Sequence, residues 1–298
     1  MSPLKGILLK IASTVMFTAM IACIKAVSET IPAGEAVFFR SFFALVPLLP
    51  LLIYRGQLMT AITTRHYISH WTRGLVGVAS MGTWFMAIGL LPMPEAFALG
   101  YASPLIAVVL AVLMLGEQVR FFRWGAVLVG FGGILFIVWP SLSLLRQGAL
   151  ETPALMGAIC ALGSSFFAAL AMILVRKLIA IEPTPAIVLH FSVNSAILAL
   201  LTLPLGWVWP NPYEAALLIL SGLLGGVGQI LLTECYRHAD TSTIAPFDYL
   251  SMLWGLLFGY VLFGDKPTSH VLIGAAIVIG AGLMIILRER QLASRVTT

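Results

Sequence analysis

The chain has 298 residues, of which 60% are hydrophobic and only 10% are charged. A soluble domain carries about 25% charged residues, so this composition excludes a soluble enzyme, and the apolar content excludes a disordered chain. The net charge of +5 comes without a basic cluster or zinc-ligand spacing, so no nucleic-acid partner is expected. The remaining class is an integral membrane protein, whose first partner is the lipid bilayer.

Ten apolar segments follow one another along the chain, and Pro, Gly or charged residues separate them. They cover residues 5–27, 35–53, 71–91, 95–115, 122–139, 154–179, 185–205, 213–236, 242–263 and 270–287. Each is a long continuous run, as a membrane-spanning helix requires, and lacks the alternation of a β-barrel strand. The sequence therefore predicts an all-α integral membrane protein with ten transmembrane helices.

The basic residues predict the orientation of these spans. With a cytoplasmic N-terminus, 13 of the 17 Lys and Arg residues fall on the cytoplasmic side. The other four are Lys25, Arg40, Arg146 and Lys266. Because cytoplasmic loops carry the excess of Lys and Arg, we expect both termini to be cytoplasmic.

The two halves of the chain share an ordered series of residues. Tyr101, Ser103 and Gly116-Glu117 recur as Tyr249, Ser251 and Gly264-Asp265 at an offset of 148. An odd number of spans in each half makes the two halves enter the membrane from opposite sides. We therefore expect an inverted 5+5 repeat, with halves at 1–140 and 154–298 joined by a periplasmic loop at 141–153. Such repeats are frequent in secondary transporters.

Several further residues carry a resemblance to a known family. In the first half they are Arg40, Leu91-Pro92, Pro104, Gly116-Glu117, Gly125, Gly130, Gly132 and Gly133. In the second half they are Tyr236 to Ala239, Gly264-Asp265, Gly274, Gly280 and Gly282. On these residues the chain resembles the EamA branch of the drug/metabolite transporter (DMT) superfamily and is similar to its YddG-type amino-acid exporters. The resemblance implies a basket-like fold with a cavity lined mainly by spans 1, 3, 4, 6, 8 and 9. His190 and Met252 replace the residues that correspond to Arg40 and Pro104, which leaves the contribution of the second half open.

Polar, aromatic and kinked positions of these spans are the candidates for a substrate cavity. They are Ser13, Phe17, Trp84, Tyr101, Ser103, Pro104, Ser164, Gln229, Tyr249 and Ser251. Pro104 cannot donate a backbone hydrogen bond and its ring clashes with the carbonyl of Gly100, so a kink is expected there. The alternative role of all these residues is helix packing, because small and polar side chains also join membrane helices.

Four ionisable residues inside the spans are candidates for gating or coupling: Arg40, His190, Glu234 and Asp248. Such groups are functional candidates because a membrane interior penalises charge. Arg40 could bind a substrate carboxylate, extend to the membrane surface or pair with Glu35. His190, Glu234 and Asp248 could form one proton-linked cluster, or a static network together with Arg237.

The resemblance implies a secondary transporter that exports small metabolites, amino acids first among them, across the bacterial inner membrane by alternating access. Two alternatives stay open: drug or cation efflux within the same superfamily, and an intramembrane enzyme that uses His190, Glu234 and Asp248. An enzyme is not expected, because no nucleophile, metal-ligand spacing or nucleotide motif accompanies those groups. No catalytic residue, metal or cofactor is predicted. The partner is a small-molecule solute, and the oligomeric state is open, a monomer included.

Overall fold

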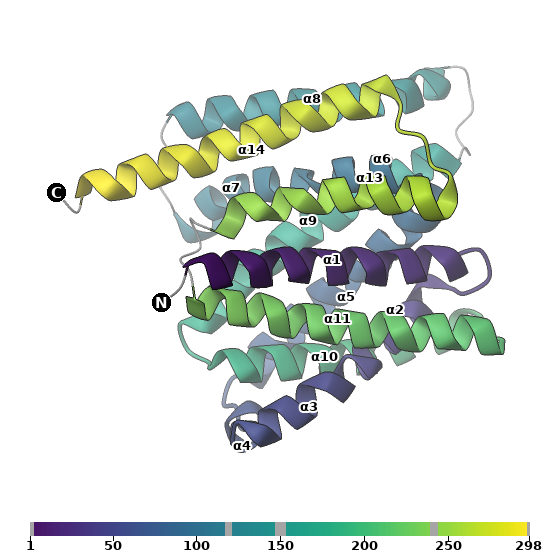
Figure 1. The fold of residues 1–298 in the computed structure, drawn as a ribbon, viewed down its shortest axis with the longest axis vertical. Helices are drawn as coiled ribbons and strands as arrows, with labels where there is room; N and C mark the ends of the chain where they lie inside the picture. The colour runs from purple at the N-terminus through teal and green to yellow at the C-terminus, as the bar shows by residue number, and fades with distance from the viewer. Residues whose placement is uncertain (1–2, 117–120, 147–152, 239–243, 297–298) are drawn as a thin grey trace.

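The computed structural model describes residues 3–116, 121–146, 153–238 and 244–296, and these form a bundle of helices (Figure 1). The helices of the first half are α1 (Pro3–Val27), α2 (Ala33–Phe43), α3 (Leu45–Tyr54), α4 (Leu58–Ile62), α5 (Tyr67–Leu90), α6 (Met93–Gly100), α7 (Ala102–Leu115) and α8 (Phe121–Arg146). Those of the second half are α9 (Pro153–Ile179), α10 (Thr184–Leu200), η1 (Leu203–Leu205), α11 (Pro212–His238), η2 (Ala245–Tyr249), α13 (Leu250–Phe263) and α14 (Ser269–Val296).

The prediction of an all-α membrane protein is confirmed. Within the described ranges, eight helical spans are long and apolar enough to cross a membrane, and Trp124–Pro140 and Thr184–Leu200 are shorter apolar helices. Large apolar side chains cover the outer surface of the bundle, with Leu113 exposed at 74% and Leu128 at 70%. A contiguous apolar surface of this kind suits contact with lipid, since soluble proteins rarely present one.

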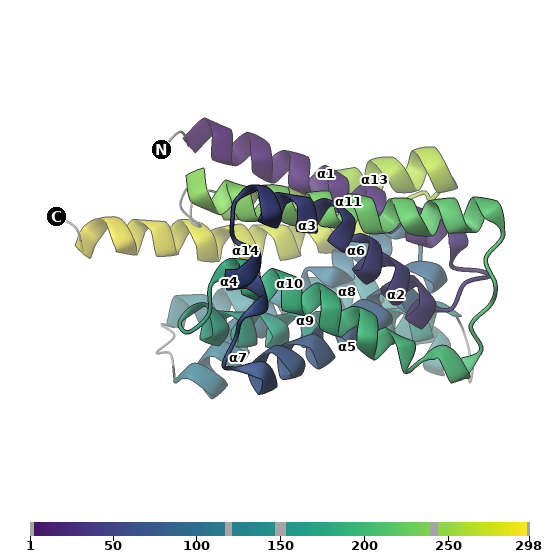
Figure 2. The same ribbon diagram turned by 90° about the horizontal axis from the view of Figure 1, so that it is seen from below.

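The helices pack in pairs that join the two halves of the sequence. α1 lies against α11, α5 against α9, and α8 against α14. Figure 1 shows α8 and α14 at one edge of the bundle and α3 and α4 at the opposite edge. The beginning of α1 and the end of α14 lie at the same end of the bundle (Figures 1 and 2), as an even number of crossings requires.

Two spans that the sequence predicts as continuous are broken by proline. The second span divides at Ala44 into α2 and α3, because Pro47 cannot donate a hydrogen bond to the carbonyl of Phe43. The fourth divides at Tyr101 into α6 and α7, where the kink is expected from Pro104. Ser165 Oγ donates to the freed carbonyl of Gly100 (3.3 Å), so a neighbouring helix satisfies this acceptor.

Two predicted boundaries are wrong. The loop expected at 141–153 begins inside a helix, since α8 continues to Arg146. The seventh span, expected to reach residue 205, ends as α10 at Leu200, because Pro204 lacks the N–H that would continue it and Gly206 then takes a positive φ of 97°. The remainder of that loop (147–152) and Glu117 of the repeated Gly-acid pair lie outside the described residues.

Candidate functional site

A cavity of about 800 Å³ lies between α3, α5, α9, α10 and α11. Its polar lining consists of Arg55, Gln57, Arg73, Thr184, Gln229, Thr233, Glu234, Tyr236 and Arg237. Arg55 follows the last residue of α3, Thr184 begins α10, and Arg237 lies in the last turn of α11. The mouth of the cavity therefore lies at the end of the bundle where α1 begins and α14 ends.

The single carboxylate among these lining residues is neutralised at the mouth. Glu234 Oε1 lies 2.5 Å from Arg55 Nη1 and 3.3 Å from Arg237 Nη1. The hydrogen bond to Glu234 raises the pKa of Arg55 above its ordinary value. This arrangement is the static network with Arg237 that the sequence left open as one of two roles for Glu234.

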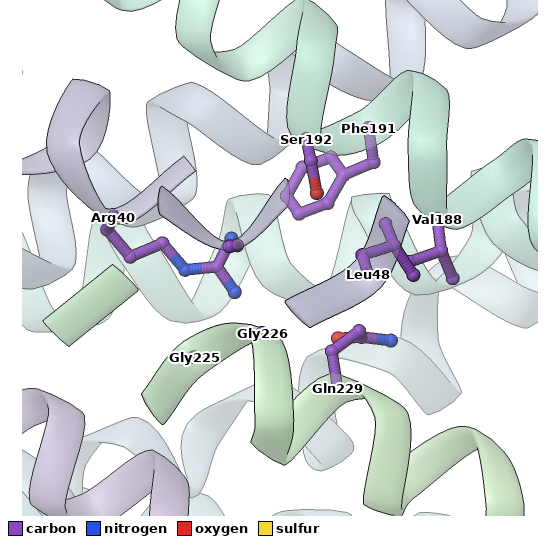
Figure 3. Close-up of a pocket in the computed structure, with 9 residues that line it drawn as sticks. Arg40, Leu48, Val188, Phe191, Ser192, Gly225, Gly226 and Gln229 are labelled. Atoms are coloured by element: carbon purple, nitrogen blue, oxygen red, sulfur yellow. The ribbon is translucent and has the colours of Figure 1, made fainter. Parts of the chain in front are cut away.

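Two arginines lie beside Phe191 at the deep end of the cavity, Arg73 in its lining and Arg40 in a smaller pocket next to it. Arg73 Cζ lies 4.0 Å from the centroid of the Phe191 ring, and Arg40 Cζ lies 5.9 Å from the same centroid. The two guanidinium carbons are therefore within roughly 10 Å of each other, about one Debye length at 0.1 M salt. Figure 3 shows the guanidinium group of Arg40 extending from α2 toward the space bounded by Phe191 and Gln229. This smaller pocket shares Leu48, Val188, Phe191 and Gln229 with the large cavity, so the two are adjacent.

Neither arginine has a partner that neutralises it. Arg40 is only 6% exposed, and among the described residues neither Arg40 nor Arg73 forms an ion pair or a side-chain hydrogen bond. An arginine at the centre of a membrane helix costs about 2.5–3.5 kcal/mol on insertion scales. Two such groups side by side without a carboxylate are a feature that packing alone does not explain.

The unsatisfied polar atoms of the described chain gather in this region. In the described residues, the buried side-chain nitrogens and oxygens that lack a hydrogen-bond partner belong to Arg40, Ser41, His70, Arg73, Asn194 and Ser195. These residues lie on three helices, α2, α5 and α10, which pack against one another. Because buried polar groups are normally hydrogen-bonded, a cluster of unsatisfied ones indicates a place where a ligand or water binds.

Histidines form a second network beside the mouth. The His70 and His190 rings lie 4.5 Å apart, and His66 Nδ1 lies 2.7 Å from Glu182 Oε1. Thr64 Oγ1 donates to the same carboxylate oxygen at 2.5 Å. Burial of Glu182 acts to raise its pKa, but the hydrogen bonds from Thr64 and His66 outweigh it and hold the pKa below the ordinary value.

At the opposite end of the bundle, polar contacts join the two halves. Lys25 Nζ, at the end of α1, donates to the carbonyls of Leu91 (2.8 Å) and Ile88 (3.2 Å) and lies 3.7 Å from Asp265 Oδ2. The same Asp265 oxygen accepts the N–H of Met93 at 2.8 Å, at the start of α6. One carboxylate thus joins α1, α6 and the linker between α13 and α14.

The repeat-related tyrosines meet at the interface of the two halves. The rings of Tyr101 and Tyr249 lie 5.1 Å apart, and Tyr101 Oη lies 2.6 Å from Ser251 Oγ. Tyr101 Oη also accepts the N–H of Met252 at 3.1 Å, a donor in the first turn of α13 that has no partner within its own helix. The structure thus brings three of the predicted cavity residues together, in a bonded cluster.

Most of the other predicted cavity residues also have protein partners. Ser13 Oγ donates to the carbonyl of Gly228 (2.9 Å), Ser164 Oγ donates to the carbonyl of Ser80 (2.9 Å), and the Trp84 ring lies 5.7 Å from that of Phe97. Phe17 packs against the main hydrophobic core, and Ser103 and Pro104 lie in the first turn of α7.

Gln229 alone among the ten predicted residues lines the large cavity. The expected lining by spans 1, 3, 4, 6, 8 and 9 is thus only partly correct. The cavity uses spans 3, 6 and 8, but spans 2 and 7 (α3 and α10) replace spans 1, 4 and 9. The reason is that the kinked second span and α10 surround the mouth, while α1 packs tightly between α11 and α13.

The predicted cluster of His190, Glu234 and Asp248 does not form. No hydrogen bond or ion pair joins any two of them in the described part of the chain, because each has its own partner on a different helix. Asp248 Oδ1 lies 2.5 Å from Lys10 Nζ, and the Lys10 side chain is only 4% exposed. The proposed pairing of Arg40 with Glu35 is also wrong, since Glu35 Oε2 accepts the N–H of Val208 instead (3.0 Å).

Arg73 is the site residue that the sequence reasoning missed. It was counted among the cytoplasmic charges, whereas α5 begins at Tyr67 and carries Arg73 almost two turns inside the helix. The available signal was the absence of any Asp or Glu within four residues of Arg73 in the sequence, which leaves no local partner for its charge.

The fold and this site define a multi-pass helical membrane protein with a polar cavity that is open at one end. The sequence model of the EamA-like transporter family matches residues 4–139 and again 155–287. The chain therefore belongs to the EamA-like transporter family, and it is a transporter rather than an enzyme.

Related proteins of known function carry different solutes. The chain is 29% identical to an S-adenosylmethionine uptake transporter of Rickettsia bellii, over 88% of this chain and 86% of the relative. It is 30% identical to a riboflavin transporter of Rhizobium johnstonii (87% and 83%) and 29% identical to a pseudopaline exporter of Pseudomonas aeruginosa (93% and 94%). A solved crystal structure with 18% identity superposes with a TM-score of 0.65 over 96% of this chain and 98% of the other, which supports the fold.

Proposed function

We propose that this protein is a secondary transporter that exports small metabolites, amino acids in particular, across the bacterial inner membrane. The observation that carries the proposal is the cavity of about 800 Å³ with its mouth at one end of the bundle. With both termini in the cytoplasm, as the basic residues predict, this mouth faces the cytoplasm and is placed to load a solute for export.

Alternating access requires a closed end as well as an open one. Lys25 and Asp265 tie α1, α6 and the linker after α13 together at the end away from the mouth. The two family matches divide the chain into two similar halves, so each half can adopt the conformation that the other now holds. Exchange of the two conformations closes the cytoplasmic mouth and opens the outer end.

The choice of amino acids rests on the resemblance to amino-acid exporters and on the charge of the cavity. The relatives include one uptake transporter and one exporter, so family membership alone fixes neither the solute nor the direction. A cation-efflux function is disfavoured by the arginines that line the two pockets and by the pairing of Glu234.

The test is counterflow in proteoliposomes that contain the purified protein and one unlabelled amino acid at high concentration. Labelled amino acids are added outside one at a time, with and without a pH gradient. We expect labelled solute to accumulate for a subset of amino acids. If no amino acid accumulates while the protein is folded and correctly inserted, the amino-acid assignment is wrong. Accumulation that ignores the gradient indicates facilitated diffusion rather than proton coupling.

A further inference from the structure

We infer that Arg40 and Arg73 form a carboxylate-binding site at the deep end of the cavity, and that the transported solute carries a carboxylate which this pair holds. The inference rests on the proposed transport function and names the chemical class of its substrate. It is carried by two buried guanidinium groups that both lie beside Phe191, with 5.9 Å from Arg40 Cζ and 4.0 Å from Arg73 Cζ to the ring centroid.

The donors at this site are present and unused. Arg40 Nε, Arg73 Nε and Arg73 Nη1 are buried and have no hydrogen-bond partner in the described part of the chain. Guanidinium groups offer planar forks of N–H donors that match the two oxygens of a carboxylate. One carboxylate shared between the two groups would satisfy these donors and neutralise charge that the surrounding helices leave uncompensated.

The rest of the cavity sets where the remainder of the solute lies. The two adjacent pockets are lined by four arginines (Arg40, Arg55, Arg73 and Arg237) against the single carboxylate of Glu234. Glu234 is already paired with Arg55 and Arg237, so no free acid among the lining residues attracts a second ammonium group. The site therefore favours acidic and neutral amino acids over basic ones. Gln229 and the apolar side chains of Leu48 and Val188 are in place to contact the body of the solute.

Gly225 on α11 leaves the space that the Arg40 side chain occupies. A Cβ atom added to Gly225 would lie 3.3 Å from Arg40 Nε and 2.8 Å from the sulfur of Met20. A side chain at this position would press on both groups and shift them. The close approach of α11 to α2 thus holds Arg40 with its donors toward Phe191 and Gln229 (Figure 3).

The test measures binding without depending on transport. Thermal stabilisation of the purified full-length protein in detergent is titrated with L-leucine, L-leucinamide, succinate and inorganic phosphate at constant ionic strength. L-leucinamide keeps the side chain and the amino group but lacks the carboxylate, whereas succinate has carboxylates without an amino group. We expect saturable stabilisation by leucine and succinate, and none by leucinamide.

The variants Arg40→Gln and Arg73→Gln should weaken carboxylate binding by about tenfold to a hundredfold, the usual loss for a charge-assisted hydrogen bond. Arg65→Gln is the matched control, because Arg65 is exposed and lines neither pocket. It should change the affinity by less than about threefold, as expected for an exposed charge. Without ligand, both site variants should melt at or above the wild-type temperature, since each removes an unpaired buried charge. A purely structural arginine would instead lower it.

Three results would overturn the inference. They are equal binding of leucine and leucinamide, unchanged carboxylate affinity in both site variants, and arginine-dependent binding of phosphate without binding of carboxylates. Failure of the carboxylate site can be distinguished from failure of the proposed function. Arginine-dependent binding of succinate together with a failure of every amino acid in counterflow keeps the carboxylate site and removes only the amino-acid assignment. Amino-acid transport with an unchanged KM in both variants keeps the function and removes the site.

Discussion

Lys25 and Asp265 come from the two ends of the chain and meet at one end of the bundle, with 3.7 Å between Lys25 Nζ and Asp265 Oδ2. The lysine also donates to two carbonyls at the end of α5, and the aspartate accepts the first free N–H of α6. Four segments from both halves therefore depend on one ion pair. In a transporter that opens alternately at its two ends, such a contact is suited to be the outer latch.

The latch predicts an energetic coupling between the two residues. Lys25→Met and Asp265→Asn should each lower the free energy of unfolding by about 1–3 kcal/mol, because each leaves a largely buried partner unpaired. The double variant should lose less than the sum of the two, with a coupling energy of about 1 kcal/mol or more. Unfolding of all four proteins in mixed micelles measures this cycle. Additive losses, within about 0.3–0.5 kcal/mol, would show that the two residues are neighbours that do not stabilise each other.

Removal of the Asp248 charge should impair transport, and a variant that keeps the charge provides the control. The carboxylate of Asp248 compensates the buried ammonium group of Lys10 in the N-terminal part of α1. Asp248→Asn leaves that charge alone, and uptake in proteoliposomes should fall by about tenfold or more, equivalent to 1.4 kcal/mol. Asp248→Glu, which keeps the charge, should retain most of the activity. Normal uptake by Asp248→Asn, with and without a pH gradient, would exclude this residue from gating and coupling.

Removal of the Tyr101 hydroxyl alone should destabilise the protein. Tyr101→Phe leaves the N–H of Met252 without an acceptor and removes the contact with Ser251. The free energy of unfolding should fall by about 1–3 kcal/mol, the usual cost of a buried unsatisfied group. Tyr260→Phe is the control, because Tyr260 is 59% exposed and its hydroxyl forms no hydrogen bond within the described part of the chain. This variant should stay within about 0.5 kcal/mol of wild type. Equal effects of the two substitutions would contradict the hydrogen bonds assigned to Tyr101.

The contribution of Glu182 to the stability of the fold should depend on pH. Its pKa is held below the ordinary value in the folded protein, so it stabilises the fold above the unfolded pKa of about 4.3 and loses this contribution as the pH falls through the lower folded value. The difference in melting temperature between wild type and Glu182→Gln should therefore be largest near neutral pH and shrink below about pH 4. Glu29→Gln, at an exposed position, is the control. A difference that does not change between neutral and acidic pH would refute the lowered pKa.

The fold was largely predictable because each membrane helix satisfies its own backbone hydrogen bonds, so length and hydropathy alone mark it. The kink at Tyr101 was predictable as well, since Pro104 acts on its own helix. The boundary error at the seventh span arose where proline and glycine in the loop after α10 ended the helix earlier than hydropathy indicates.

The candidate site was much less predictable. Arg40 was identified by its place inside a span, but Arg73 was not, because the predicted span begins at residue 71 and puts Arg73 at its end, whereas α5 begins at Tyr67. The cluster expected from His190, Glu234 and Asp248 failed for a different reason. Their similar depth was read from the sequence, whereas their different partners depend on how α10, α11 and η2 are rotated in the bundle.

One measurement tests alternating access through this cavity most directly. Gln229→Cys is placed in a variant whose native cysteines, Cys23, Cys160 and Cys235, are replaced by serine. A membrane-impermeant maleimide is then applied to inside-out vesicles and, separately, to right-side-out spheroplasts. We predict rapid labelling from the cytoplasmic side, slow labelling from the outer side, and faster outer labelling when Lys25→Met and Asp265→Asn are added. Labelling only from the outer side, or equally from both sides whether or not the latch is intact, would contradict a cavity that opens to one side of the membrane at a time.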